Sequence, residues 1–359
     1  MRVLQLIDSL DAGGAERVAV NIANALSLKE NFKSYLCNTR KEGVLKNSLD
    51  NNVEYLFLNK KHTLDVSAIK RLHQFVRNND IRIIHAHSTS FFLATIIKIS
   101  LPDLVLIWHE HYGNREKTSK ASKLVLKGCS YFFSCIIAVN KSLKKRSESK
   151  LFPKDVYLVP NYPVINSELK QTNLYGNNGK RIICLANFRP DKDHLNLLTA
   201  FALLLKLHKN WTLHLVGKFV KDEYCNAINN FIKQNYLENS IFIYGVRNDI
   251  SNILNQCEIG ILSSKSEGLP MALLEYGLAK LSVIATNVGD CNKVVSNLDE
   301  GILVEPENNK ALFKALLKLI DHVDLRKRMA ENLHNKVVAS FSESNTVVVL
   351  IKIYGQYKK

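Results

Sequence analysis

Two glutamates with seven residues between them, Glu267 and Glu275, lie in the segment SEGLPMALLE. An apolar run of strand length precedes this segment, and Pro270 suits the first turn of a helix that continues from there. The free N–H groups and the partial positive charge at the start of a helix attract anions. We therefore predict a phosphate seat in the loop of Gly268, Leu269 and Pro270.

The two glutamates can read hydroxyl-bearing parts of the same ligand. Glu275, more than a turn inside the helix, can accept hydrogen bonds from a ribose, and Glu267, in the loop, can accept them from an attached sugar. The competing interpretation is that Glu267 only caps the helix while Glu275 is solvated. This motif alone does not separate the two interpretations.

A second candidate for anion chemistry is the segment ANFRPDKDH at 186–194, where Arg189 and Lys192 follow an apolar run and precede the apolar, helix-like stretch LNLLTAFALLLK. Fixed cations offset the negative charge that a departing diphosphate develops, commonly by several kcal/mol in a transition state. Lys192 is the leading candidate for this role. The competing interpretation is an ordinary basic loop in which Asp191 or Asp193 caps the helix.

The first loop, 8–17, places Gly13 and Gly14 between a predicted strand and a predicted helix. Glycines at such a position permit close approach of a phosphate or sugar to the backbone. The loop lacks the third spaced glycine of G-x-G-x-x-G, so a nicotinamide or flavin dinucleotide site is poorly supported. A tight turn is the competing interpretation.

Two H-x-H pairs, His85 with His87 and His109 with His111, are expected at strand ends. Such pairs can coordinate a metal, so a metal-dependent hydrolase is an alternative function. A hydrolase would need further ligands from other strand ends and would leave the motifs of the second half unused. The metal site is therefore the less favoured interpretation, and hydrogen-bonded structural histidines are the commoner one. We predict that His109, directly after the apolar run LVLIW, faces the ligand site.

Basic residues concentrate between Arg115 and Lys154, where 11 Lys or Arg residues stand against two acidic ones. Such a surface can bind anionic lipid headgroups, and a solvated basic face is the competing interpretation. Nucleic-acid binding is less favoured, because no recognised binding module is present. Four lysines in this region fall within about 120° of one another on an ideal helix, and Leu124 partly interrupts the stripe that they form: Lys117, Lys120, Lys123 and Lys127. Aromatic residues follow at 131–133.

These motifs follow apolar runs of strand length, which alternate with longer segments of helical periodicity. Runs that are apolar on both faces suit parallel strands covered by helices on each side. The predicted fold class is therefore α/β, with two Rossmann-like, doubly wound parallel-sheet domains facing a central cleft, where ligands bind at the strand ends. The segment 161–180 loses this periodicity, and we place the linker there. The predicted strands are 3–7, 34–37, 53–58, 81–85, 104–108, 136–139 and 156–159, then 181–187, 211–217, 240–245, 259–264, 282–286 and 301–305.

Composition supports a globular protein of two domains. The chain has 359 residues, of which 46% are hydrophobic and 23% charged, and its formal net charge of +16 points to an anionic partner. Seven scattered cysteines without a C-x-x-C pair suggest neither disulfides nor structural zinc and fit a reducing cytoplasm. No export signal and no bilayer-spanning segment is expected, since the best candidate, 91–108, contains Lys98, Pro102 and Asp103.

The segment GVRNDISNILNQCEIGILSSKSEGLPMALLEYGLAKLSVIATNVGDCNKVV, with its glutamate pair, resembles the donor-binding half of the family 4 retaining glycosyltransferases. The likeness extends through GGAER, WHEHYG, AVNKSLKKR, ANFRPDKDH and VEPENN. It implies the GT-B architecture, with an acceptor-binding Rossmann-like domain at 1–165 and a nucleotide-sugar-binding Rossmann-like domain at 166–340. A C-terminal helix at 341–359 is then expected to cross back to the first domain.

The resemblance also implies roles for single residues. By the family's pattern Lys192 contacts the diphosphate and Glu275 the ribose. Glu267 contacts the sugar, His109 contacts the sugar near the reacting carbon, and Gly14 lies on the phosphate side of the cleft.

Many members carry an arginine at the position of Asn187, so either Asn187 or Arg189 is expected at the diphosphate. The further residues predicted to bind the donor are Gly13, Gly245, Val246, Gly268, Leu269 and Pro270.

The resemblance predicts transfer of a hexose or N-acetylhexosamine from a nucleotide-diphosphate sugar, UDP-linked, to a hydroxyl of a glycan or lipid-linked glycan, with retention of anomeric configuration. The expected setting is bacterial surface polysaccharide assembly, such as capsule or O-antigen. No metal, cofactor or nucleic acid is expected. A cytoplasmic enzyme, peripheral on the inner face of the membrane, would fit the basic first half.

Overall fold

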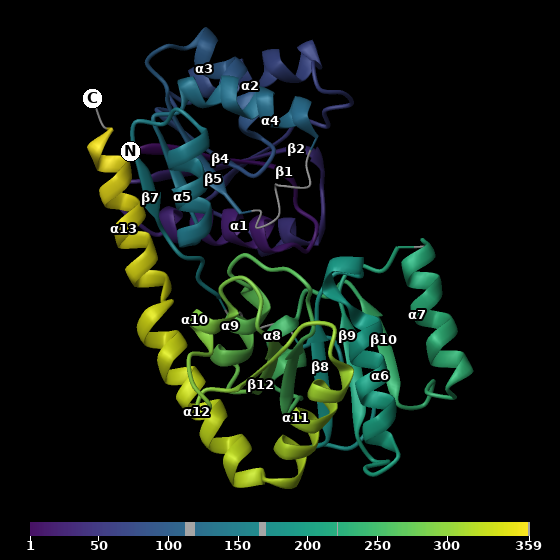
Figure 1. Cartoon of the computed structure of the whole chain (residues 1–359). Helices are drawn as coiled ribbons and strands as arrows, with labels where there is room; N and C mark the ends of the chain where they lie inside the picture. Colours follow the sequence, from purple (N-terminus) through teal and green to yellow (C-terminus); the bar gives the residue numbers. More distant parts are fainter. Residues whose placement is uncertain (112–118, 165–169, 221, 358–359) are drawn as a thin grey trace. The chain divides into compact units, whose positions relative to one another are not determined.

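The computed structural model describes residues 1–111, 119–164, 170–220 and 222–357. Within it the chain divides into two compact units. Unit 1 contains Met1–Tyr162 and Glu343–Lys359, and unit 2 contains Pro163–Ser342. Each unit has one parallel sheet with helices on both faces, so the predicted fold class of two doubly wound α/β sheets is confirmed (Figure 1).

The sheet of unit 1 has seven parallel strands in the order β3-β2-β1-β4-β5-β6-β7. The central strands are buried on both faces because helices cover both, which is why the sequence shows them as continuous apolar runs. The strands are β1 (Arg2–Ser9), β2 (Lys33–Lys41), β3 (Glu54–Phe57), β4 (Ile83–His87), β5 (Val105–Glu110), β6 (Cys135–Ala138) and β7 (Val156–Leu158).

The helices of unit 1 form two layers. One core joins the sheet to α2 (Val66–Asn78), α3 (Phe91–Ser100) and α4 (Lys120–Cys129), and it includes the buried Trp108. On the other face, α1 (Gly14–Ser27) packs its apolar side onto β1 and β2 (Figure 1).

Four further elements are described in unit 1, of which the short helix η1 (Val44–Ser48) follows β2. The other three are α5 (Lys141–Lys150), which contacts β6 and β7, the short helix η3 (Ser130–Phe132), and the C-terminal helix α13 (Glu343–Gln356), which lies against α1.

The sheet of unit 2 has six parallel strands in the order β10-β9-β8-β11-β12-β13. The order places β8 directly beside β11, although 73 residues separate the end of one from the start of the other. The strands are β8 (Arg181–Leu185), β9 (Thr212–Val216), β10 (Ile241–Gly245), β11 (Ile259–Leu262), β12 (Ser282–Thr286) and β13 (Ile302–Val304).

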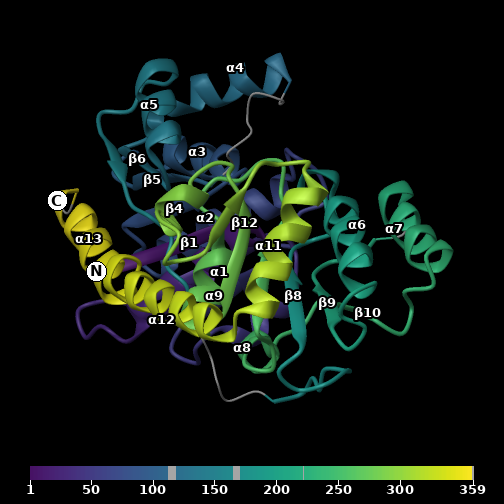
Figure 2. The ribbon, with the colours of Figure 1, turned by 60° about the horizontal axis from the view of Figure 1, so that its bottom comes forward.

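Helices also cover both faces of the second sheet (Figures 1 and 2). The large core beneath one layer contains side chains from α6 (His194–Leu205), α7 (Glu223–Gln234) and α11 (Asn309–Asp321). The helices α9 (Met271–Leu278) and α12 (Val323–Ser340) contact each other and β12.

Several helices begin at a residue whose side chain accepts a hydrogen bond from the first turn. Asp65 accepts from the N–H of Ala68 at the start of α2, and Asp222 accepts from Cys225 at the start of α7. Such caps satisfy N–H groups that have no partner within the helix, each typically worth about 1 kcal/mol.

The stretch Val323–Gln356 is long and apolar enough to cross a membrane by length and composition. Part of its apolar surface is buried: Leu333 in α12, and Leu350 and Ile353 in α13. Val348 and Val349 are 50% and 41% exposed. The stretch is divided into two helices, α12 and α13, each of which has buried residues.

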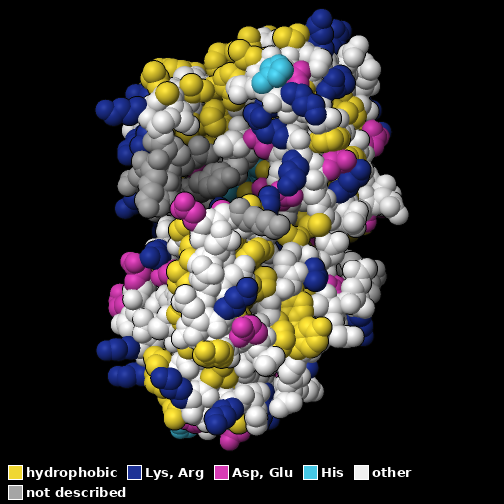
Figure 3. Space-filling model, turned by 90° about the vertical axis from the view of Figure 1, so that its right-hand side faces the viewer, with side chains coloured by type: hydrophobic (Ala, Val, Ile, Leu, Met, Phe, Trp, Pro, Cys, Tyr) yellow, Lys and Arg dark blue, Asp and Glu magenta, His cyan; other side chains and the backbone are white. Residues whose placement is uncertain are grey.

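One face of the molecule shows how its charged side chains are distributed. Figure 3 shows one face of the molecule, on which lysine and arginine side chains are spread among acidic, polar and apolar ones. The formal charge of +16 is therefore not gathered into one patch on that face.

Candidate active site

Two neighbouring strands of unit 2 end in loops that are hydrogen-bonded to each other. The loop after β8 carries the short helix η4 (Pro190–Lys192), and the loop after β11 begins at Ser263. The hydroxyl of Ser263 donates to the carbonyl of Lys192 at 2.9 Å, and the N–H of Lys265 donates to the carbonyl of Asp191 at 2.8 Å. These bonds fix the backbone that carries the predicted cation.

Lys192 and Glu267 meet at this junction. The Nζ atom of Lys192 lies 2.6 Å from Oε1 of Glu267, and the two side chains are only 14% and 9% exposed. The same carboxylate oxygen accepts a hydrogen bond from the hydroxyl of Ser264 at 2.6 Å. An ammonium and a carboxylate are thus held together in a largely desolvated place, where charge interactions are strong.

The helix after this loop begins as the sequence predicts. Pro270 is the N-cap residue of α9, and no side chain caps that end by a hydrogen bond. The interpretation of Glu267 as a helix cap is therefore wrong. The interpretation of Glu275 as a solvated residue is also wrong, because its side chain is buried at 4% exposure within α9. A buried carboxylate beside a helix start fits a ligand role better than a surface role.

Tyr276 anchors α9 to the sheet. Its hydroxyl accepts from the N–H of Leu185 at 2.7 Å and donates to the carbonyl of Ile261 at 3.2 Å, so it joins β8 to β11. Its ring packs where a side chain of residue 260 would stand, and a Cβ on Gly260 would come within 2.5 Å of that ring. The glycine in the strand IGIL therefore lets α9 approach closely.

A second glycine shapes the loop of the phosphate seat. Gly289 has a φ of +56°, and a Cβ there would lie 2.2 Å from the carbonyl oxygen of Glu267. The next residue, Asp290, donates its N–H to the carbonyl of Gly268 at 2.9 Å. Sequence reasoning missed Ser264 and Gly289, although the glycine after strand 282–286 was a visible signal.

Asn187 and Arg189 lie in the loop after β8 but differ in surroundings. The Oδ1 atom of Asn187 accepts from the N–H of Lys218 at 2.8 Å and so ties this loop to the end of β9. Arg189 is 55% exposed and pairs with Asp191 at 3.2 Å. These contacts do not bring Asn187 or Arg189 to Glu267, whereas Lys192 pairs with Glu267 directly.

Gly245 and Val246 lie at the carboxyl end of β10. Gly245 has a φ of +68°, which favours glycine, and its carbonyl accepts from the N–H of Gly217 at 3.0 Å. The carbonyl of Val246 accepts from Nη1 of Arg247. The predicted donor-binding residues of unit 2 therefore all lie at or beyond the carboxyl ends of β8, β10 and β11, as is general for open α/β sheets.

Gly13 and Gly14 belong to unit 1. Gly13 is the N-cap residue of α1 with extended backbone, and Gly14 is the first residue of that helix and is exposed. A Cβ on Gly13 would lie 2.3 Å from the carboxylate of Glu16. The two glycines thus lie between β1 and α1, as predicted, and the backbone at Gly13 is extended and not left-handed.

The histidine pairs are not both at strand ends. β4 extends to His87, two residues beyond the prediction, because its residues continue to pair with β5. His85 and His109 therefore lie inside the sheet and are buried, and only His87 and His111 stand at or beyond the strand ends. The register pairs His87 with His109, so residues two apart on both strands point to the same face.

The four imidazoles form a stack on that face. Ring centroids lie 4.6 Å apart for His85 and His87, 5.1 Å for His85 and His109, and 4.1 Å for His109 and His111. Burial lowers the pKa of His85 to about 3, with a smaller effect from His111. Burial also lowers the pKa values of His87 and His109 well below the usual range. The buried imidazoles are therefore neutral near pH 7.

Ring nitrogens of His85, His87 and His109 lie within 4.8 Å of one another, a spacing that would allow three histidines to bind one metal ion. Both nitrogens of His87 are already hydrogen-bonded, Nδ1 to His111 at 3.0 Å and Nε2 to Gln5 at 2.9 Å. Nδ1 of His85 is bonded to the hydroxyl of Tyr354 in α13 at 2.7 Å. In contrast, Nε2 of His85 and both ring nitrogens of His109 are buried without a hydrogen-bond partner among the described residues. The cluster therefore combines bonded and unpartnered imidazole nitrogens.

Of the predicted basic surface, Lys117 lies outside the described residues. Lys120, Lys123 and Lys127 are exposed on α4. Nζ of Lys127 lies 5.0 Å from the ring centroid of Phe152.

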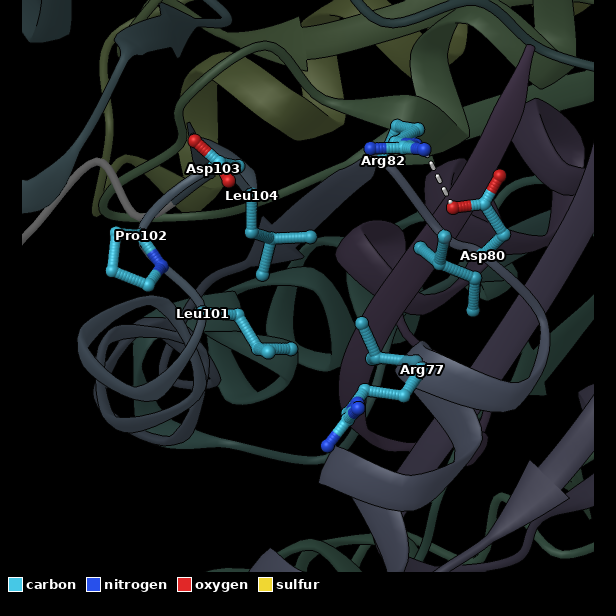
Figure 4. Close-up of a pocket in the computed structure, with 9 residues that line it drawn as sticks. Arg77, Asp80, Arg82, Leu101, Pro102, Asp103 and Leu104 are labelled. Atoms are coloured by element: carbon cyan, nitrogen blue, oxygen red, sulfur yellow. Dashed lines mark ion pairs between the residues drawn. The ribbon is translucent and has the colours of Figure 1, made fainter.

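A pocket of about 280 Å³ lies in unit 1, at the edge of the sheet where β4 and β5 begin (Figure 4). Arg82 and Asp80 in its wall form an ion pair at 2.9 Å. The pocket contains none of the predicted site residues. We do not consider it the active site.

Two family models match almost the whole chain. The model described as "Glycosyltransferase Family 4" matches residues 12–162, and the one described as "Glycosyl transferases group 1" matches residues 165–336. The chain belongs to the family 4 glycosyltransferases. The predicted family and enzyme class are thus confirmed, and the comparisons give no support to a metal-dependent hydrolase or a nucleic-acid-binding protein.

Curated relatives of this family 4 glycosyltransferase include two that each match more than 80% of the chain. One is the UDP-Gal:alpha-D-GlcNAc-diphosphoundecaprenol alpha-1,3-galactosyltransferase of Escherichia coli, 25% identical, with 92% of this chain and 90% of the relative covered. Another is the capsular polysaccharide biosynthesis glycosyltransferase CapH of Staphylococcus aureus, 24% identical, with 82% and 83% covered.

Solved structures show the same fold. Anabaena HepE in complex with UDP and glucose superposes with a TM-score of 0.83 at 19% identity, covering 99% of this chain and 100% of that one. The sucrose-phosphate synthase of Thermosynechococcus elongatus gives a TM-score of 0.80 at 15% identity, covering 99% of both chains. The GT-B architecture predicted for this glycosyltransferase is therefore confirmed.

Proposed function

We propose that this glycosyltransferase transfers a hexose or N-acetylhexosamine from a UDP-sugar to a hydroxyl of a glycan or lipid-linked glycan, with retention of anomeric configuration. The proposed setting is the assembly of a bacterial surface polysaccharide. The observation that carries the proposal is the buried pair of Lys192 and Glu267 beside the start of α9.

The relatives support a UDP-sugar donor and a lipid-linked acceptor. The name of the Escherichia coli relative specifies UDP-galactose and a diphosphoundecaprenol-linked sugar, and a Campylobacter jejuni relative is also named for a diphospho-undecaprenol acceptor. HepE was crystallised with UDP-glucose. A hydroxyl acceptor attached to such a lipid is available at a membrane surface.

In the proposed reaction, the bond between the sugar carbon C1 and the diphosphate oxygen breaks, and C1 forms a bond to the acceptor oxygen on the same face. The departing UDP carries the negative charge that Lys192 and the N–H groups at the start of α9 are placed to stabilise. A leaving phosphate oxygen takes the proton of the acceptor hydroxyl. This route assigns the charge stabilisation to protein groups, and we propose that no metal or cofactor is required.

Within this proposal, the two glutamates orient the donor. Glu267 accepts from a sugar hydroxyl while it remains fixed by Ser264. Glu275, buried in α9, accepts from the ribose. The proposed location is the cytoplasm, at the inner face of the membrane, where soluble UDP-sugars and a lipid-linked acceptor would meet.

The proposal is tested by calorimetry with UDP, GDP and ADP, followed by a panel of UDP-sugars with a lipid-diphosphate-linked acceptor. We expect UDP to bind more tightly than the other two nucleotides and one UDP-sugar to yield a product with the donor's anomeric configuration by NMR. Equal binding of all three nucleotides, or an inverted product, would contradict the proposal. Treatment with EDTA should leave turnover unchanged.

A further inference from the structure

An apolar side chain points outward from a basic helix in unit 1. Helix α4 packs through its buried residues Leu126 and Cys129, and Leu124 lies roughly 140° to 200° around the helix from them. Leu124 is accordingly 72% exposed, and its neighbour Val125 is 44% exposed. A helix that packs in the usual way would place polar residues on this outer side.

Aromatic side chains extend this apolar area beyond the end of α4. Tyr131 in η3 is 67% exposed, seven residues after Leu124 and therefore on the same side of a helical path. Its ring stacks on Phe152 with centroids 4.2 Å apart, and Phe152 is itself 42% exposed. The N–H of Phe152 donates to the hydroxyl of Ser130 at 3.0 Å, so the two segments are joined. The aromatic pair is thus preformed and remains open to solvent.

Cations flank these apolar residues. Lys127 contacts the ring of Phe152, and Lys150 and Lys154 are exposed on either side of Phe152 in the sequence. Helix α4 contains no Asp or Glu. We call this set the amphipathic surface, and its members are Lys120, Lys123, Leu124, Val125, Lys127, Tyr131, Phe132, Lys150, Phe152 and Lys154.

We propose that the amphipathic surface binds an anionic lipid bilayer, with Leu124, Tyr131 and Phe152 inserted among the headgroups and the lysines in contact with lipid phosphates. The evidence for this surface is independent of the donor site, although its purpose rests on the proposed lipid-linked acceptor. Binding there would keep unit 1 at the membrane during repeated encounters with acceptors.

The residue types favour a bilayer over other anionic partners. Amphipathic rings prefer the water–lipid boundary, and long lysine side chains reach phosphates while their methylene groups stay in contact with apolar surface. Exposed Leu124 and Val125 would gain nothing from a nucleic-acid backbone. Burial of one leucine side chain is worth roughly tenfold in affinity or more, and each lysine near an anionic surface roughly fivefold.

The test uses the full chain and vesicles without donor or acceptor. Flotation is measured with vesicles of phosphatidylcholine alone and of phosphatidylcholine with phosphatidylglycerol. The apolar variant carries Leu124→Ser, Tyr131→Ser and Phe152→Ser. The basic variant carries Lys120→Gln, Lys123→Gln and Lys127→Gln. The matched controls are on unit 2, where Tyr236 is 90% exposed: Tyr236→Ser for the apolar variant, and Lys206→Gln, Lys209→Gln and Lys233→Gln for the basic variant.

We expect the wild type and both controls to float with the anionic vesicles and only weakly with neutral ones. Each surface variant should bind anionic vesicles at least tenfold more weakly than the wild type. The apolar variant keeps only the lysines, so its remaining binding should vanish in high salt, whereas that of the basic variant should not. In a separate Tyr131→Trp protein, tryptophan fluorescence should shift to the blue on anionic vesicles.

Wild-type protein that fails to float with anionic vesicles, or an apolar variant that floats as well as the wild type, would overturn the proposal. Binding of the basic region to single-stranded DNA without vesicle binding would do the same and would favour nucleic acid. UDP-sugar turnover with a water-soluble acceptor is measured in parallel. If the wild type shows no such turnover, that result would count against the proposed function but would not affect the conclusion on bilayer binding.

Discussion

Lys192 and Glu267 form an ion pair, with Nζ 2.6 Å from Oε1, across a sequence separation of 75 residues. The pair exists because β8 and β11 are neighbours in the sheet of unit 2. It keeps the cation in place without a ligand, since the carboxylate balances its charge. In the proposed function, an entering diphosphate gives Lys192 a second anion, and Glu267 also accepts a hydrogen bond from a sugar hydroxyl.

Glu267→Gln should lower kcat with UDP-sugar by about 10- to 100-fold, because the amide removes the charge that orients Lys192 and weakens acceptance from the sugar hydroxyl. The isosteric side chain should leave the fold intact. Steady-state kinetics with the best donor measures the change. The control is Glu331→Gln, which removes an exposed carboxylate paired with Lys280. A variant at Glu267 that retains full kcat would contradict the role.

Ser264→Ala should reduce kcat/KM by about tenfold, since a buried hydrogen bond to a carboxylate is worth about 1.5–3 kcal/mol. Threonine at the same position retains the hydroxyl and should restore part of the activity. The matched control is Ser282→Ala, where a buried hydroxyl donates to the carbonyl of Glu258 instead. Both alanine variants should lose stability in urea unfolding, but only Ser264→Ala should lose activity.

Gly289→Ala should disturb the phosphate loop. The new methyl would stand 2.2 Å from the carbonyl oxygen of Glu267 at a φ of +56°. Gly179 also has a positive φ, of +78°, but its side-chain space is open. Alanine at 179 should therefore cost only the backbone strain, about 1–2 kcal/mol, and keep activity. Alanine at 289 should also weaken UDP binding by tenfold or more in calorimetry, and equal UDP binding by the two variants would refute the steric argument.

The stability of unit 1 should fall as the pH falls below about 6.5. Burial holds the pKa of His85 at about 3 and those of His87 and His109 well below the usual value. In the unfolded chain these groups titrate near 6.5, so acid protonates the unfolded state first and favours it. Their contribution is complete above about pH 6.5 and is lost towards pH 3, with a slope of up to about 4 kcal/mol per pH unit for three groups.

Urea unfolding followed by Trp108 fluorescence measures this slope in a Trp211→Phe background, since the chain has two tryptophans and Trp108 is the one in unit 1. His85→Asn should reduce the slope by about one-third. Replacing the exposed His62 by Gln should not change it. A stability independent of pH between 6.5 and 4.5 would show that the buried histidines are not held neutral.

Strand positions could be predicted from sequence because parallel strands covered on both faces appear as apolar runs. The ends could not, as β5 shows: the prediction stopped at Trp108, but His109 and Glu110 continue to pair with β6 despite their polarity. Backbone pairing with neighbours, which local sequence does not record, overrides the side-chain pattern. The same effect extended β4 to His87 and moved His85 into the interior.

The loop and helix positions of the candidate donor-site residues could be predicted from local spacing, but the contacts among these residues could not. Glu267 and Glu275 were identifiable from the loop and helix that carry them. The ion pair of Lys192 with Glu267 depends on strand order, and the role of Ser264 depends on where its hydroxyl points. Such relations arise from topology and rotamers, which are set by the whole unit.

We propose that Lys192 and Glu275 hold UDP at the carboxyl edge of the unit 2 sheet. The most direct measurement is titration calorimetry of UDP with wild type, Lys192→Ala, Glu275→Gln and the exposed control Lys206→Ala. We expect the two site variants to bind UDP at least tenfold more weakly than the wild type, and the control to bind UDP like the wild type. UDP affinities that are the same in all four proteins would contradict it.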